Sequence, residues 1–219
     1  MILTMLKTHP MSILEKIKTN YSASTNEMTV AAYLDECKKN PKVYAKPAER
    51  ILDAIGEAEM VDTRQDPVLS RIFSNKRIKV YPAFRDFYGM ESTVEQIVSY
   101  FRHSAQGLEE KKQILYLMGP VGGGKSSLAE KLKHLMQQNP IYVLKAGQEV
   151  SPVFESPLGL FADYTEELEG EYGIPPRYVP SCMSPWASKR LREFGGDINR
   201  FKVIMLYPSI QEQIAISKT

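Results

Sequence analysis

Residues 119–127, Gly-Pro-Val-Gly-Gly-Gly-Lys-Ser-Ser, combine residue types that can bind a polyphosphate. They fit the pattern of a glycine, four residues of any type, and then Gly-Lys-Ser. Glycine backbones can turn successive N–H groups toward one anion, and the start of a following helix adds partial positive charge. Lys125 can reach the β- and γ-phosphates, and the Ser126 hydroxyl suits Mg²⁺, which prefers oxygen ligands. We therefore predict that this segment binds ATP together with Mg²⁺.

The predicted contacts to the nucleotide form one continuous run, in which Ser126 is also the predicted Mg²⁺ ligand and Ser127 is its neighbour in the first helical turn. The run consists of Gly119, Pro120, Val121, Gly122, Gly123, Gly124, Lys125, Ser126 and Ser127. The alternative interpretation is a plain glycine-rich turn. The flanking sequence favours the phosphate loop, because an apolar strand (residues 114–118) precedes it and an amphipathic helix (residues 127–136) follows.

A second apolar strand, residues 141–144, follows that helix. The order strand, glycine loop, helix, strand is a βαβ unit and predicts a parallel sheet. Upstream, a helix over residues 92–106 is predicted to begin with a capping box, in which Ser92 is followed by Glu95. The predicted fold class is an α/β P-loop NTPase of the AAA+ type with a parallel-sheet core.

A helical segment precedes this core in the predicted organisation. Apolar residues recur at helical spacing between residues 30 and 37, and a second helix is predicted to begin at Pro47 and to end at Gly56. Helical patches are also predicted near residues 164–173 and 184–196, a buried strand over residues 201–209, and a last helix or strand over residues 210–219. We place the helical N-terminal segment at residues 1–66 and the nucleotide-binding domain at residues 67–219.

Composition argues against several other classes of protein. The 219 residues carry a net charge of +2 without a basic block, so no nucleic-acid partner is predicted. No apolar run approaches the roughly 20 residues of a membrane-spanning helix. Cys37 and Cys182 lack metal-ligand spacing, and a reducing cytoplasm fits two isolated thiols.

One expected part of an ATP-hydrolysing site is missing from the sequence. P-loop hydrolases pair the loop with a carboxylate on a neighbouring strand, which holds Mg²⁺ and helps to orient the attacking water. The remaining apolar strand, KVIMLYPS, ends in Tyr207 and Pro208 instead. The catalytic residues therefore stay unassigned, and we expect this chain to bind ATP but scarcely to hydrolyse it.

Several longer stretches resemble the amino-terminal AAA+ region of the bacterial PrkA family of serine protein kinases. They include AERILDAIGEAEMVDT, YPAFRDFYGMESTVEQIVSYFRHSAQG, EYGIPPRY and MSPWASKRLREFGGD. The resemblance implies that Tyr88, Gly89 and Met90 lie near the adenine, although these residues could also form only a loop and a helix start. It implies a chain truncated inside the ATPase core, a protein substrate, and possible self-association into an AAA+ ring.

The kinase activity rests on this resemblance alone, because no phosphotransfer signature occurs in the sequence. The predicted function is Mg-ATP binding as the AAA+ region of a PrkA-like serine protein kinase. The alternative is a nucleotide-responsive assembly or interaction module without phosphotransfer activity of its own.

Overall fold

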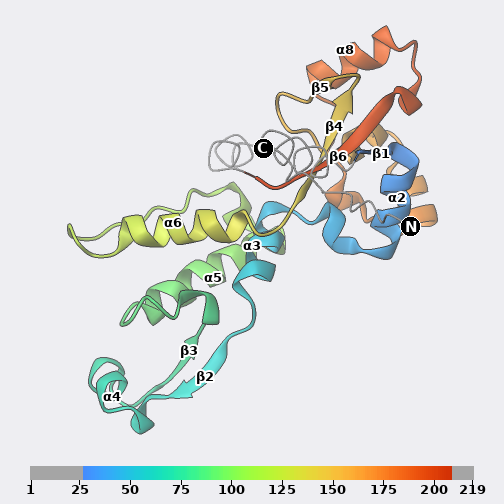
Figure 1. Cartoon of the computed structure of the whole chain (residues 1–219). Helices are drawn as coiled ribbons and strands as arrows, with labels where there is room; N and C mark the ends of the chain where they lie inside the picture. Colours follow the sequence, from blue (N-terminus) through green and yellow to red (C-terminus); the bar gives the residue numbers. More distant parts are fainter. Residues whose placement is uncertain (1–26, 209–219) are drawn as a thin grey trace, which may run out of the picture.

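The computed structural model describes residues 27–208, which form seven α-helices and two small β-sheets (Figure 1). The helices are α2 (Val30–Lys39), α3 (Pro47–Ile55), α4 (Pro67–Phe73), α5 (Glu91–Ala105), α6 (Lys125–Met136), α7 (Thr165–Tyr172) and α8 (Pro185–Glu193). The strands are β1 (Glu27–Thr29), β2 (Glu59–Asp62), β3 (Arg77–Val80), β4 (Ile141–Ala146), β5 (Glu149–Val150) and β6 (Phe201–Leu206). The predicted element over residues 210–219, and the part of the predicted helical segment before residue 27, lie outside the described residues.

Local sequence signals explain where the first two helices begin and end. Thr29 caps α2 by accepting a hydrogen bond from the Ala32 N–H at 3.1 Å. Pro47 is the first residue of α3, where its missing N–H leaves no helical bond unmade, and Gly56 ends that helix with a φ of 78°. Both helices match the sequence prediction.

The predicted capping box of the long helix is wrong. α5 begins at Glu91, its N-cap residue is Met90, and no side chain caps it among the described residues. Ser92 therefore lies inside the first turn. The Glu95 carboxylate binds the Lys79 ammonium at 2.7 Å instead, so a tertiary ion pair has replaced the local contact.

The larger sheet has the strand order β1-β6-β4-β5, and every strand pair in the described part of the chain is antiparallel. The predicted parallel pairing does not occur there, and residues 114–118 form no strand. The absence of the parallel pair is explained by the neighbours of β4. β6 covers one side of β4, while β5 and a backbone bond between Leu144 and Glu155 cover the other. The segment before the glycine loop therefore has no access to the strand expected to be its neighbour.

Residues 114–118 nevertheless keep the alternation that predicted a strand. Leu115 and Leu117 pack against a buried cluster, whereas Ile114, Tyr116 and Met118 are 90%, 78% and 80% exposed. An extended backbone sends successive side chains to opposite sides, which accounts for this separation. The segment lies beside α6 and leads into the glycine loop.

Two main hydrophobic cores hold the described residues together. The first core joins α2 to β4, β6, α7 and α8, and its fully buried members include Tyr33, Leu144 and Phe201. The second core joins α3, α5 and α6 and includes Ile51, Ile97 and Leu128. Figure 1 shows the elements of the first core at the upper right and α5 and α6 of the second core at the left. The β2–β3 hairpin and α4 extend from the second core, below α5. The domain boundary at residue 66 stays a prediction.

Candidate nucleotide-binding site

The glycine loop forms an exposed turn that leads directly into α6. Gly122 and Gly124 have φ values of 80° and 74°, a left-handed conformation that a side chain would strain. The Gly123 N–H donates to the Pro120 carbonyl at 3.2 Å, which closes the turn. The Leu128 N–H then donates to the Gly124 carbonyl at 2.9 Å and starts the helix. The left-handed backbone at Gly122 and Gly124 is one that glycine adopts without strain.

Lys125 folds back over the loop that precedes it. Its ammonium donates to the Gly119 carbonyl at 2.8 Å and also to the Pro120 carbonyl. Two neutral carbonyl acceptors therefore hold the Lys125 ammonium beside the turn. A phosphate could take the place of those carbonyls, because charge-assisted bonds are stronger than bonds to neutral oxygens.

The start of α6 offers free backbone donors. Among the described residues, no side chain caps this helix at Gly124. The first N–H groups of a helix lack internal partners, and together with the helix dipole they favour an anion. Ser126 and Ser127 lie exposed in the same first turn. These features fit a phosphate group.

Side chains at Gly123 and Gly124 would also meet close neighbours. A Cβ atom on Gly123 would lie 3.1 Å from the Pro120 carbonyl oxygen. A Cβ atom on Gly124 would lie 3.0 Å from the sulfur of Met90. The second contact shows that Met90, which the resemblance placed near the adenine, packs directly against the glycine loop.

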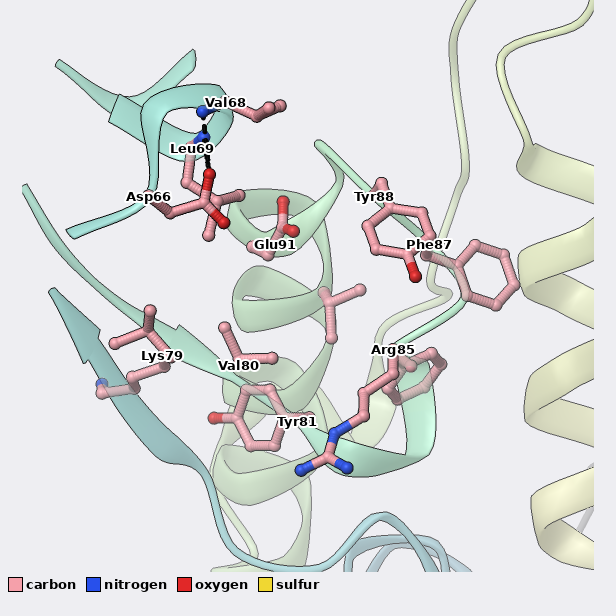
Figure 2. A pocket seen from close by; sticks show the side chains of 13 residues that line it. Asp66, Val68, Leu69, Lys79, Val80, Tyr81, Arg85, Phe87, Tyr88 and Glu91 are labelled. Carbon is pink, nitrogen blue, oxygen red and sulfur yellow. Dashed lines mark hydrogen bonds between the residues drawn. The ribbon is translucent and has the colours of Figure 1, made fainter. Parts of the chain in front are cut away.

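Met90 reaches the loop from the turn that precedes α5. In that turn Tyr88 is 84% exposed, and Gly89 has a φ of 76°. The Asp86 carboxylate lies 4.0 Å from the Lys131 ammonium of α6, which ties the turn to the helix behind the loop. Sequence reasoning did not find this ion pair, because no local pattern relates residues so distant in the chain. Tyr88 also lines a pocket between this turn, α4 and the β2–β3 hairpin (Figure 2).

The described residues contain neither a metal-binding cluster nor a membrane-spanning helix. Across residues 27–208, His, Cys, Asp and Glu side chains form no group of three or more that could hold a metal ion. Within the same range, no helix has both the length and the apolar composition needed to cross a bilayer.

Comparison with known proteins gives the family of this chain. Residues 28–219 match the family described as the PrkA AAA domain. The chain belongs to the PrkA AAA domain family. The match confirms the resemblance seen in the sequence, and an AAA domain implies a P-loop NTPase.

Two curated relatives extend this result. The chain is 58% identical over 212 residues to the serine/threonine kinase YeaG of Escherichia coli K12, covering 95% of this chain and 33% of the relative. It is 31% identical over 218 residues to the ATP-dependent protease PrkA of Bacillus subtilis, covering 94% of this chain and 32% of the relative. The chain thus spans about a third of the length of these relatives. No solved structure matches it significantly.

Proposed function

We propose that this chain binds Mg-ATP at residues 119–127 as the nucleotide-binding part of a PrkA-like serine/threonine protein kinase. The observation that carries the proposal is the glycine loop itself. Its two left-handed glycines, the uncapped start of α6 and the ammonium of Lys125 meet at one exposed turn. Each of these features favours an anion, and their combination favours a polyphosphate.

Each residue has a distinct role in the proposed complex. The N–H groups of the loop and of the first turn of α6 bind the phosphates, and Lys125 exchanges its carbonyl contacts for the β- and γ-phosphates. Ser126 holds the Mg²⁺, which would neutralise phosphate charge when bound. Tyr88, Gly89 and Met90 lie toward the adenine, and the contact between Met90 and Gly124 supports that placement.

Replacing Ser126 with Ala should weaken Mg-ATP binding more than binding of ATP without the metal. The hydroxyl is proposed to contact the metal, so its removal has little effect when Mg²⁺ is chelated. Isothermal titration with and without EDTA measures both affinities. Ser188→Ala, a first-turn serine of α8, is the matched control and should change neither. An equal loss under both conditions would contradict the metal role of Ser126.

The alternative to a kinase region is an interaction module without phosphotransfer activity. The rate of ATP hydrolysis distinguishes the two. We expect ATP binding with little phosphate release from this chain, because β6 is followed by Tyr207 and Pro208 where a carboxylate would be sought. Steady-state phosphate release, compared with a Lys125→Ala variant, measures this. Sustained turnover that depends on Lys125 would show that an unassigned acid is catalytic, and would contradict the expectation.

One of the two relatives is named a kinase and the other a protease. A direct assay distinguishes these two activities. Casein incubated with γ-labelled ATP reports phosphate transfer, and its cleavage products report proteolysis. The more similar relative is named a kinase, which favours transfer for the protein as a whole. We expect the isolated chain to do neither and the E. coli relative, run as a reference, to transfer phosphate.

The proposal also covers the cellular location of the protein and its assembly with other chains. We propose a cytoplasmic protein, because Cys37 and Cys182 are both free thiols. A protein substrate and assembly into an AAA+ ring are the proposed partners, since AAA domains commonly act as oligomers. The mild net charge of +2 supports no nucleic-acid partner.

A further inference from the structure

Helix α4 is the only one of the seven helices within residues 27–208 that contains no buried residue. Leu69 and Phe73, four residues apart, are half-buried and form one apolar stripe of the helix. Val68 and Ile72, also four residues apart, form a second stripe and are 66% and 50% exposed. A helix that packs on one side needs only one apolar stripe. The second stripe is therefore available for a contact outside the molecule.

Polar contacts at its two ends hold α4 in place. The Asp66 carboxylate caps the helix by accepting the Val68 N–H at 2.8 Å. The Ser70 hydroxyl donates to Asn75 Oδ1 at 2.7 Å, across the turn that follows the helix. Ser74 and Asn75 in that turn have φ values of 52° and 61°, a left-handed conformation uncommon for residues other than glycine. None of these contacts uses the side chains of the exposed stripe.

Positive charge surrounds this stripe. Residues 71–77 contain three basic residues and no acid. Arg71 and Lys76 are exposed, and within residues 27–208 neither side chain forms an ion pair. We call the exposed stripe and these two bases the α4 surface; it consists of Val68, Arg71, Ile72 and Lys76. A partner for this surface needs an apolar side chain flanked by carboxylates.

The chain itself carries such a combination at α7. Residues 163–171 contain five acids and no base. Glu166 and Glu169 are exposed, and neither forms an ion pair with another described residue. Carboxylates three residues apart on a helix repel each other, so a nearby positive charge stabilises them. Tyr164, just before the helix, is 55% exposed and completes what we call the α7 surface.

The α4 and α7 surfaces lie at opposite ends of the molecule. Figure 1 shows α4 at the lower left and α2 at the right. α7 packs against α2, where the Lys38 ammonium donates to the Glu171 carbonyl at 2.9 Å. The two surfaces therefore cannot meet within one chain, although they can meet between two chains.

We propose that the α4 surface of one chain docks on the α7 surface of a second copy of the chain. The apolar stripe of α4 contacts the Tyr164 ring, and the two bases pair with Glu166 and Glu169. The two surfaces differ, so the interface is heterologous, and each added copy leaves one surface free at either end. This inference extends the assembly proposed above by naming its surfaces. Neither surface contains a residue of the candidate nucleotide site, so the contact requires no ATP.

Sedimentation velocity of the full chain without nucleotide tests the association. We expect the weight-average sedimentation coefficient to rise with protein concentration at about 50 mM salt and to rise less at about 500 mM, because salt screens exposed charges. A monomer at every soluble concentration in low salt would overturn the proposal.

Two double variants then locate the interface. Arg71→Gln with Lys76→Gln neutralises the α4 surface, and Glu166→Gln with Glu169→Gln neutralises the α7 surface. Each should weaken the association at least about tenfold, because each removes both proposed ion pairs. An equimolar mixture of the two should form a dimer and nothing larger, because each variant retains one native surface. A mixture that associates as weakly as either variant alone would overturn the pairing.

A control separates the interface from a general effect of charge. Glu57→Gln with Arg192→Gln also removes two exposed charges, away from both surfaces, and should leave the association unchanged. If this control weakens the association as much as the other double variants do, the contact is not at the α4 and α7 surfaces.

Exchanging the charges of the two surfaces provides an independent test. Arg71→Glu and Lys76→Glu, combined with Glu166→Lys and Glu169→Lys, should restore self-association to within a few-fold of the wild type, since opposite charges again face each other. No recovery in this variant would contradict the proposed ion pairs. All of these variants should bind Mg-ATP as the wild type does, so failure of the assembly and failure of the nucleotide site are measured separately.

Discussion

Replacing Lys125 with Ala should lower the affinity for Mg-ATP at least about tenfold, which corresponds to about 1.4 kcal/mol. In the structure the Lys125 ammonium is held over the loop by the carbonyls of Gly119 and Pro120. It therefore already lies at the turn that would cradle the β- and γ-phosphates. Its removal leaves the backbone N–H groups and the helix dipole as the remaining positive charge. Isothermal titration with Mg-ATP measures the loss.

A lysine on the same helix provides the control for this prediction. Lys133 forms an exposed ion pair with Glu130 two turns after the loop. Lys133→Ala removes one positive charge from α6 and should leave the ATP affinity within about twofold, because charges at that distance are screened by salt. Equal affinity of the wild type and the Lys125→Ala variant would end the assignment of residues 119–127 as a phosphate loop.

Replacing Phe201 with Ala should lower the free energy of unfolding by about 3–5 kcal/mol. Phe201 is fully buried at the start of β6, and its ring makes edge contacts with Trp186 of α8 and with Phe194. The truncation therefore removes apolar contacts between β6 and both ends of α8 and leaves a cavity in the first core. A loss of this size is a large part of the stability of an ordinary domain.

Urea unfolding measures this loss, with Trp186 as the fluorescent reporter. It is the one tryptophan of the sequence and lies 6.4 Å from the Phe201 ring, measured between ring centroids. Tyr207→Ala removes an exposed aromatic ring just after the same strand and should change the stability by about 0.5 kcal/mol or less. If the two variants unfold at the same urea concentration, Phe201 does not anchor the first core.

Sequence reasoning predicted those elements whose cause is local. The helix over Val30–Lys39 follows from apolar spacing and a threonine cap, and the helix that begins at Pro47 follows from its proline and from Gly56. The strand prediction for residues 114–118 was wrong because a strand also requires a neighbour. The alternation of those residues is local, whereas the occupation of both sides of β4 depends on residues far along the chain.

In the candidate site, too, local features could be predicted and contacts between distant residues could not. The glycine loop could be proposed from the sequence because its residue types and spacing are contiguous, and in the structure Gly122 and Gly124 are left-handed. The contact between Met90 and Gly124 could be anticipated only from family resemblance. Nothing in the sequence indicated that Tyr81 and Tyr88 line one pocket, because that depends on how α4 and the β2–β3 hairpin pack against α5.

The pairing of β1 with β6 constrains the order in which this chain can fold during its synthesis. Glu27 pairs with Ile204, so the first described strand leaves the ribosome long before its partner. At about 5–20 residues per second, that delay is on the order of ten seconds. The second core, which closes within residues 51–135, is complete well before then. Tyr33 can contact Tyr142 of β4 earlier, but the apolar face of α2 is fully covered only after the last strand of the first core has been made.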